Sequence, residues 1–260
     1  MRSFLKTSFE SAFRLTLPPH CVSCGVRLDA EPDPILLCTA CRTEVFREDW
    51  FYCPNCGYSA SAPPNPGGCA ECRFRRFRFD GVVPMGVYAG RLRECVLKMK
   101  RTAGLPLAGA FGRYYCAVRI SSLRKLDVEA VLATPMHWTR RMGRGTNSPD
   151  LIARRIARSL KIPNFSKSLR RTRKTRPQAG LTPTKRRDNV RNAFCVKSKD
   201  YLKGKRLLLV DDILTTGATC HEIAKVLKAA GAVNVFVAVL ARAEGPDSRL
   251  PASPGLIGAP

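Results

Sequence analysis

The pattern of apolar and polar positions predicts strands that alternate with helices over most of the chain. Strand-like apolar segments occupy 81–88, 128–135, 207–210 and 233–240. Between them, apolar residues recur at the spacing of amphipathic helices. The three sets are Leu92, Cys95, Val96 and Met99; Leu151, Ile152, Ile156 and Leu160; and Ile223, Ala224, Val226, Leu227 and Ala230, the last followed by a helix stop at Gly231.

The segment 207–231 is the clearest of these units: a strand, a polar loop and a helix. The continuous apolar run 207–210 predicts a central strand of a parallel sheet, and Asp211 and Asp212 are expected to end it. A loop at this end of a strand is where ligands bind, and the helix start offers free amides to an anion. The loop residues suit a phosphate: Thr215, Thr216, Gly217, Ala218 and Thr219.

The acidic pair has a different expected role, because two carboxylates beside a phosphate would repel it. We expect Asp211 and Asp212 to lie outside the apolar core and to bind sugar hydroxyls, directly or through a divalent cation. The alternative is an ordinary buried strand followed by a helix capped at Thr215 or Thr216. An ordinary cap, however, requires neither the acidic pair nor the run of threonines.

Three segments lack the alternation of strands and helices. Residues 1–20 place Phe4, Leu5, Phe9, Ala12 and Phe13 on one face of a short amphipathic helix. Residues 170–194 combine high charge and prolines with weak periodicity, which predicts a mobile functional loop. Residues 243–260 are rich in Pro, Gly and Ser, which predicts a disordered tail.

Eight of the twelve cysteines form four Cys-x-x-Cys pairs within residues 21–75. They are Cys21 and Cys24, Cys38 and Cys41, Cys53 and Cys56, and Cys69 and Cys72. Gly25 and Gly57 follow the first pair of each half and would permit the tight turn of a zinc knuckle. The pattern predicts two structural Zn²⁺ ribbons. The repeat favours consecutive sites, and a cross-braced arrangement is the alternative.

Composition indicates the kind of partner and the cellular compartment of the protein. The 45 lysines and arginines against 20 acidic residues give a net charge of +25, which indicates a phosphate-rich partner. No uncharged run is long enough to cross a bilayer, and the N-terminus lacks the apolar core of a secretory signal. A cytoplasmic protein with reduced cysteines is therefore expected, which disfavours disulfides; a mitochondrial presequence is the lesser alternative.

Two basic segments are candidates for phosphate contacts. Residues 73–80 alternate arginine with phenylalanine, which is typical of a half-buried strand or of a surface that stacks single-stranded nucleic acid. Arg140, Arg141 and Arg144 lie in a glycine-containing turn after the strand 128–135, and guanidinium groups there suit a pyrophosphate, unless the turn is simply a solvated basic loop.

The sequence VDDILTTGAT at 210–219 resembles the phosphoribosyl pyrophosphate (PRPP) motif of type I phosphoribosyltransferases. The resemblance implies that Asp211 and Asp212 hold the ribose hydroxyls of PRPP, which binds with Mg²⁺. It implies that the 5′-phosphate is held by Leu214, Thr215, Thr216, Gly217, Ala218 and Thr219.

The order of motifs is similar to that of the ComF family of competence-related proteins. The four cysteine pairs, the sequence PMHWTRRMGRGTN, the PRPP motif and a series between them carry the resemblance. That series is Gln178, Leu181, Arg186, Asn189, Ala193 and Phe194. Thr146 and Ser148 depart from the usual family pattern.

The family implies an α/β fold, a type I phosphoribosyltransferase-like parallel sheet flanked by helices and preceded by a small double zinc ribbon. The expected divisions are a helix in 1–20, the ribbon in 21–75, the phosphoribosyltransferase-like domain in 76–242 and the tail. Gln178, Arg186 and Asn189 would belong to a flexible loop that closes over the site.

Two functions follow from the resemblance. One is an enzyme of pentosyl transfer whose acceptor is unknown, acting in DNA uptake or nucleotide-linked metabolism. The other is a non-catalytic factor that binds single-stranded DNA and uses the fold only to bind phosphate. The family also implies a replication-restart helicase as a partner.

Overall fold

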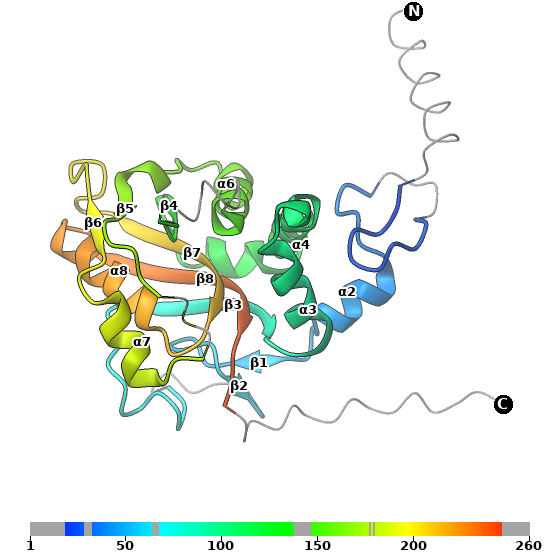
Figure 1. Ribbon diagram of the computed structural model, residues 1–260, viewed down its shortest axis with the longest axis horizontal. Helices are drawn as coiled ribbons and strands as arrows, with labels where there is room; N and C mark the ends of the chain where they lie inside the picture. Colours follow the sequence, from blue (N-terminus) through cyan, green and yellow to red (C-terminus); the bar gives the residue numbers. More distant parts are fainter. Residues whose placement is uncertain are drawn as a thin grey trace, which may run out of the picture.

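A computed structural model describes residues 19–28, 33–63, 68–137, 147–176, 178 and 180–245. Its centre is a parallel sheet with the strand order β3-β8-β7-β4 (Figure 1). The strands are β3 (Gly81–Val87), β8 (Asn234–Arg242), β7 (Arg206–Leu214) and β4 (Ala130–Ala133). All four coincide with predicted strand segments, and β7 has a neighbour on each side, which confirms its central position.

Helices cover both faces of this sheet (Figure 1). Because successive side chains of a strand point to opposite faces, β7 contributes to two cores. Leu208 and Val210 pack with α3 (Gly90–Met99), α4 (Leu105–Arg124) and α6 (Ser148–Leu160). Leu207 and Leu209 pack with α8 (Ala218–Ala229) on the other face. α4 has no clear apolar stripe from which it could be predicted, because small and apolar residues lie on most sides of this 20-residue helix.

Residues 170–194 contain regular structure in part of their described length, whereas the sequence predicted a mobile loop without packed structure. β5 (Leu169–Arg171) pairs antiparallel with β6 (Phe194–Val196), and α7 (Pro183–Val190) lies between them in the chain. Val190, Ala193 and Phe194 are buried in the core beneath α8. These few apolar residues anchor the segment. They are too widely spaced among the arginines to form a periodic pattern in the sequence.

The Cys-rich segment consists of two turns of the same form with short elements around them. In each turn a glycine amide donates to the first cysteine carbonyl, Gly25 to Cys21 at 2.8 Å and Gly57 to Cys53 at 2.7 Å. Both glycines have positive φ angles, 81° and 75°, as a tight turn requires. The accompanying elements are α2 (Thr39–Val45), β1 (Phe51–Tyr52) and β2 (Ser59–Ala60).

Arg119 of α4 joins this segment to the sheet. Its Nε donates to the Pro84 carbonyl of β3 at 2.9 Å. Its guanidinium lies 4.8 Å from the ring centre of Phe46, 4.9 Å from that of Tyr52 and 5.8 Å from that of Trp50. A cation enclosed by three rings stabilises the contact through its charge as well as its packing.

We expect Arg119→Leu to lower the free energy of unfolding by about 2 kcal/mol, because a half-buried carbonyl loses its donor and three rings lose their cation. Urea denaturation measures this loss. Arg124→Leu, at an exposed position of the same helix, is the matched control and should change stability by less than about 0.5 kcal/mol. Equal effects of the two substitutions would contradict the role of Arg119.

Candidate functional site

The acidic pair lies inside β7, because the strand continues to Leu214 instead of ending at Asp211 as predicted. The two carboxylates consequently point to opposite faces of the sheet. Asp211 points toward α8, where its Oδ2 is 3.9 Å from the Cys220 thiol. Asp212 points toward α3, and its Oδ2 lies 3.6 Å from the Lys100 ammonium.

Asp211 is buried, with 9% of its surface exposed, which corrects the expectation that both acids lie outside the core. Burial, together with the neighbouring charge of Asp212, raises the pKa of Asp211 to about 8. The Asp212 amide donates to Asp211 Oδ1 at 2.9 Å and partly opposes this shift. Asp211 is therefore mostly protonated at neutral pH, while Asp212 faces a cation.

The loop after β7 leaves amides free at the start of α8. Gly217, with a φ of 77°, is the N-cap residue instead of Thr215 or Thr216. A Cβ at this position would lie 2.9 Å from the Phe77 ring, so only glycine fits. Within the described chain, the Thr219 and Cys220 amides have no acceptor. Such amides at a helix start form a site for an anion.

A cavity of about 460 Å³ brings the acidic pair and this loop together. Gln178 reaches it from the segment before α7, and its Nε2 donates to Thr219 Oγ1 at 2.9 Å. Lys100, which follows α3, also lines it. The polar residues around the cavity are Lys100, Thr134, Asn147, Ser148, Arg171, Gln178, Arg186, Asp211, Asp212, Thr215 and Thr219.

Several predicted residues have structural contacts. Asn189 accepts from the Arg176 amide at 3.0 Å and donates to its carbonyl at 2.9 Å, so it holds the loop before α7. Ser148 is buried, and its hydroxyl donates to the Met99 carbonyl at 3.0 Å. Asn147 donates to the Thr134 carbonyl at 2.9 Å. The three arginines predicted to bind pyrophosphate lie outside the described residues, as do Thr146, residues 1–18 and residues 246–260.

Arg242, which sequence analysis missed, connects the loop to the second cysteine turn. Its Nη1 donates to the Leu214 carbonyl at 2.9 Å and the Thr215 carbonyl at 2.6 Å. Its Nε donates to the Cys56 carbonyl at 2.8 Å, and Tyr58 lies 4.7 Å beneath its guanidinium. An arginine at the end of the apolar strand 233–240 was the available signal.

Each half of the Cys-rich segment gathers four sulfur atoms within 4.8 Å of one another. The groups are consecutive: Cys21, Cys24, Cys38 and Cys41, and Cys53, Cys56, Cys69 and Cys72. Cys53 and Cys72 sulfurs are 3.7 Å apart, and Cys56 and Cys69 sulfurs are 3.5 Å apart. Tetrahedral thiolates at about 2.3 Å from a metal lie about 3.8 Å apart, so both groups fit a metal ion, in the consecutive arrangement.

The alternating segment 73–80 forms turns, so its interpretation as a strand was wrong. Phe79 is buried, and Phe77 stacks on it with ring centres 4.6 Å apart. Phe74 is 88% exposed, with the Arg73 guanidinium 5.9 Å from its ring centre. This segment therefore anchors two rings against the loop after β7 and presents the third to solvent.

As for membranes, the described residues contain no helix of sufficient length and hydrophobicity to cross one.

Comparisons with solved structures give weak likenesses. Over 66% of this chain and 97% of its own length, a purine phosphoribosyltransferase from Pyrococcus horikoshii is 13% identical with a TM-score of 0.32. A glutamine PRPP amidotransferase from B. subtilis is 24% identical over 43% of this chain and 22% of its own, with a TM-score of 0.30. These scores are too low to add to the argument from the sheet and the loop.

Sequence comparisons are more informative. The model of the phosphoribosyl transferase domain family matches residues 151–253, which include α8 and the acidic pair. DNA utilization protein YhgH of Escherichia coli K12 is 29% identical over 88% of this chain and 99% of its own length. Competence protein F of Haemophilus influenzae is 31% identical over 86% of this chain and 97% of its own length. With this similarity over nearly its whole length, the chain belongs to the ComF family of competence and DNA utilization proteins, which carry a phosphoribosyltransferase domain.

Proposed function

We propose that this protein binds PRPP at the cavity beside the phosphate loop and handles DNA as its relatives' names indicate. The observation that carries the proposal is that two carboxylates on β7 lie beside amides at the start of α8 that have no acceptor among the described residues. Asp211 and Asp212 would hold the ribose hydroxyls, and the residues from Leu214 to Thr219 would hold the 5′-phosphate. Arg140, Arg141 and Arg144 are proposed for the pyrophosphate, since they follow β4 in the chain.

Pentosyl transfer is the reaction that such a site would support. The bond from C1′ to pyrophosphate breaks, positive charge develops on the sugar ring, and an acceptor supplies the new bond to C1′. Mg²⁺, when bound with PRPP, would neutralise charge on the phosphates. The main task of the protein is then to stabilise the leaving pyrophosphate, which favours arginines over a general base.

Gln178 and Arg186 are the residues that would close the site over a bound ligand. Gln178 already contacts Thr219, and Arg186 lines the cavity from α7. We infer that the segment before α7 tightens over a bound ligand and excludes water. Asn189 would maintain this segment through its two bonds to the Arg176 backbone, without touching the ligand.

Zn²⁺ is the metal we propose for the two cysteine groups, because four thiolates in a closed tetrahedral set favour it. Neither group has a ligand position open to a substrate, so both ions would stabilise the fold. The second group would also fix the Cys56 carbonyl and Tyr58, which hold Arg242 beneath the phosphate loop.

A second function, binding of single-stranded DNA, is favoured by the exposed ring of Phe74 among four arginines of residues 73–78. Bases stack on such rings and guanidinium groups contact the backbone. Competence and DNA utilization are the roles printed in the relatives' names. The two functions are compatible, since the ring and the phosphate loop lie in one part of the molecule.

The purified protein is expected to contain two zinc ions per chain, and Cys53→Ser combined with Cys56→Ser should retain one, because each ion has its own four ligands. Elemental analysis measures the content. Cys195→Ser, a change outside both groups, is the control and should retain two. Loss of both ions in the double variant would contradict independent sites.

Asp212→Asn should weaken binding of PRPP with Mg²⁺ at pH 7 by roughly 10- to 100-fold, because it loses charge-assisted bonds to sugar hydroxyls. Asp211→Asn should weaken it less, since burial keeps that carboxyl mostly protonated. Calorimetry measures both affinities. Asp200→Asn, at an exposed position that does not line this cavity, is the control. Parent-like binding by Asp212→Asn would refute the ribose assignment.

Stability should depend on the protonation of Asp211. Because its pKa is raised to about 8 in the folded protein, the folded state holds a proton that the unfolded chain releases above about pH 4. This contribution to the free energy of unfolding is complete at low pH and is lost as the pH rises toward 8.

The Asp211→Asn variant has no carboxyl at this position and should not lose stability in this way. Its free energy of unfolding relative to that of the parent should therefore increase as the pH rises from about 5 to 8. Urea denaturation at several pH values measures the difference, with Asp200→Asn, at an exposed position that has no ion pair within the described chain, as the control. Parallel pH profiles for the parent and Asp211→Asn would show that Asp211 is ionised throughout.

A further inference from the structure

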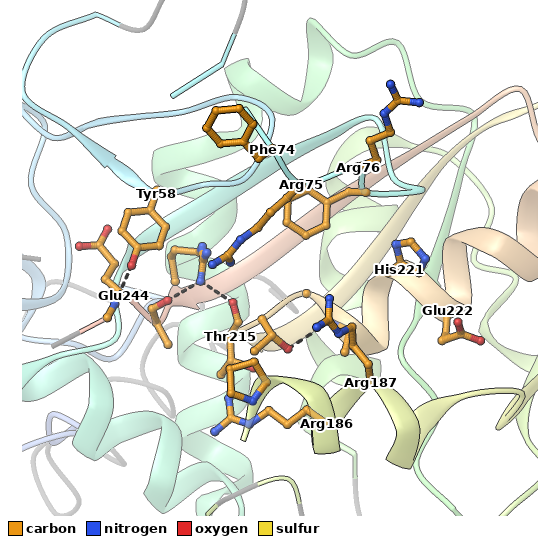
Figure 2. Close-up of a pocket in the computed structure, with 18 of the residues that line it drawn as sticks. Tyr58, Phe74, Arg75, Arg76, Arg186, Arg187, Thr215, His221, Glu222 and Glu244 are labelled. Atoms are coloured by element: carbon orange, nitrogen blue, oxygen red, sulfur yellow. Dashed lines mark hydrogen bonds between the residues drawn. The ribbon is translucent and has the colours of Figure 1, made fainter. Parts of the chain in front are cut away.

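A second cavity, of about 690 Å³, lies on the other side of the phosphate loop from the acidic pair. Five segments distant in sequence form its walls: Tyr58, residues 74–77, α7 with Arg191, the loop with the start of α8, and residues 242–245 at the end of β8. Figure 2 shows Arg75 and Arg76 on one side of this space and Arg186 and Arg187 on the other. We call it the arginine chamber.

The position of the wall at 74–77 is fixed by packing. The Phe77 ring lies against Gly217, where a Cβ would be 2.9 Å from it, and stacks on the buried Phe79. These contacts hold Arg75 and Arg76 beside the phosphate loop and leave Phe74 at the edge of the chamber, exposed. The chamber is therefore a product of the fold instead of a chance gathering of surface side chains.

Charge is the main property of the chamber. Six arginines line it, against three carboxylates, Asp188, Glu222 and Glu244. Arg242 is saturated by carbonyl groups, but the side chains of Arg75, Arg76, Arg187 and Arg191 have no carboxylate or carbonyl partner within the described chain. A single 5′-phosphate on the loop could not use this many guanidinium groups, so the ligand that fits carries further phosphates.

The chamber and the cavity of the acidic pair meet at the loop. Thr215 and Arg186 line both of them. A phosphate held by the loop would thus face a sugar site on one side and a basic space on the other. A phosphodiester meets this geometry, because it joins a sugar on each side, whereas the 5′-phosphate of PRPP has a sugar on one side only.

We propose that these joined cavities bind the 3′-terminal nucleotide of a single-stranded nucleic acid. The terminal sugar lies at Asp211 and Asp212, and its 5′-phosphate lies on the loop. The strand then continues toward its 5′ end through the arginine chamber, where Arg75, Arg187 and Arg191 contact phosphates and Phe74 stacks a base. The polarity follows from the chemistry, because in a linear strand a sugar with a 5′-phosphodiester and a free 3′-hydroxyl occurs only at the 3′ end.

This inference rests on the proposed function, because it uses the same sugar and phosphate positions as PRPP. The two ligands should therefore compete. A fluorescent short oligodeoxythymidylate with a free 3′-hydroxyl serves as the probe, and PRPP with Mg²⁺ is added to it. We expect displacement of the linear probe and little displacement of a circular single strand of the same sequence. A probe with one 3′-terminal ribonucleotide should bind more tightly, and a 3′-phosphorylated probe more weakly.

Substitutions in the chamber separate the two ligands. The double substitution Arg187→Ala and Arg191→Ala should lower the affinity for the linear probe by about 10-fold and reduce the salt dependence of its binding. The affinity for PRPP should stay at the parent value. The control is the double substitution Arg124→Ala and Arg158→Ala, which removes the same charge from outside the chamber. This control should still prefer a probe with a free 3′ end.

The outcomes are distinct. If PRPP binds but does not displace the linear probe, or if circular and linear strands compete equally with it, the 3′-end site is wrong and the PRPP site stands. If PRPP does not bind the parent protein at all, the proposed function fails, and this inference fails with it. If the double substitution in the chamber lowers the affinity for PRPP as much as the affinity for the probe, the chamber is not a separate extension of the site.

Discussion

The contacts of Arg242 hold the site and the Cys-rich segment together. Its guanidinium is buried at the end of β8 and donates to the Leu214 and Thr215 carbonyls, where β7 leads into the phosphate loop. It also donates to the Cys56 carbonyl of the second cysteine turn. Leaving these carbonyls without a donor would cost about 1 to 3 kcal/mol each. The phosphate loop therefore depends on the cysteine group for its position, although the two are separated by about 160 residues of chain.

This dependence gives the N-terminal segment a role in the site itself. Tyr58 supports the Arg242 guanidinium, and Phe77, which follows the last cysteines, packs against Gly217. Arg119 makes a second connection on the other side, from α4 to the rings of Phe46 and Tyr52. Ligand binding at the loop and metal binding at the second cysteine group should for this reason stabilise each other.

The sequence was informative where a single local pattern determines the structure. Continuous apolar runs located the four strands, and the cysteine pairs with Gly25 and Gly57 located both turns, because each signal is contained in a few adjacent residues. It was uninformative where distant residues meet. Nothing near Arg242 indicates Cys56, and no apolar stripe marks α4, which is buried on several sides. The burial of Asp211 was missed because β7 continues past the apolar run that defined it.

The central claim is that the start of α8 binds the 5′-phosphate of a sugar phosphate held at the acidic pair. Amide NMR spectra of the ¹⁵N-labelled protein, recorded during titration with PRPP and Mg²⁺, test it residue by residue. The largest shifts are predicted for the amides of Thr219 and Cys220, which have no acceptor within the described chain. Shifts confined to the Cys-rich segment, or unchanged resonances at both of these amides under saturating ligand, would contradict the account.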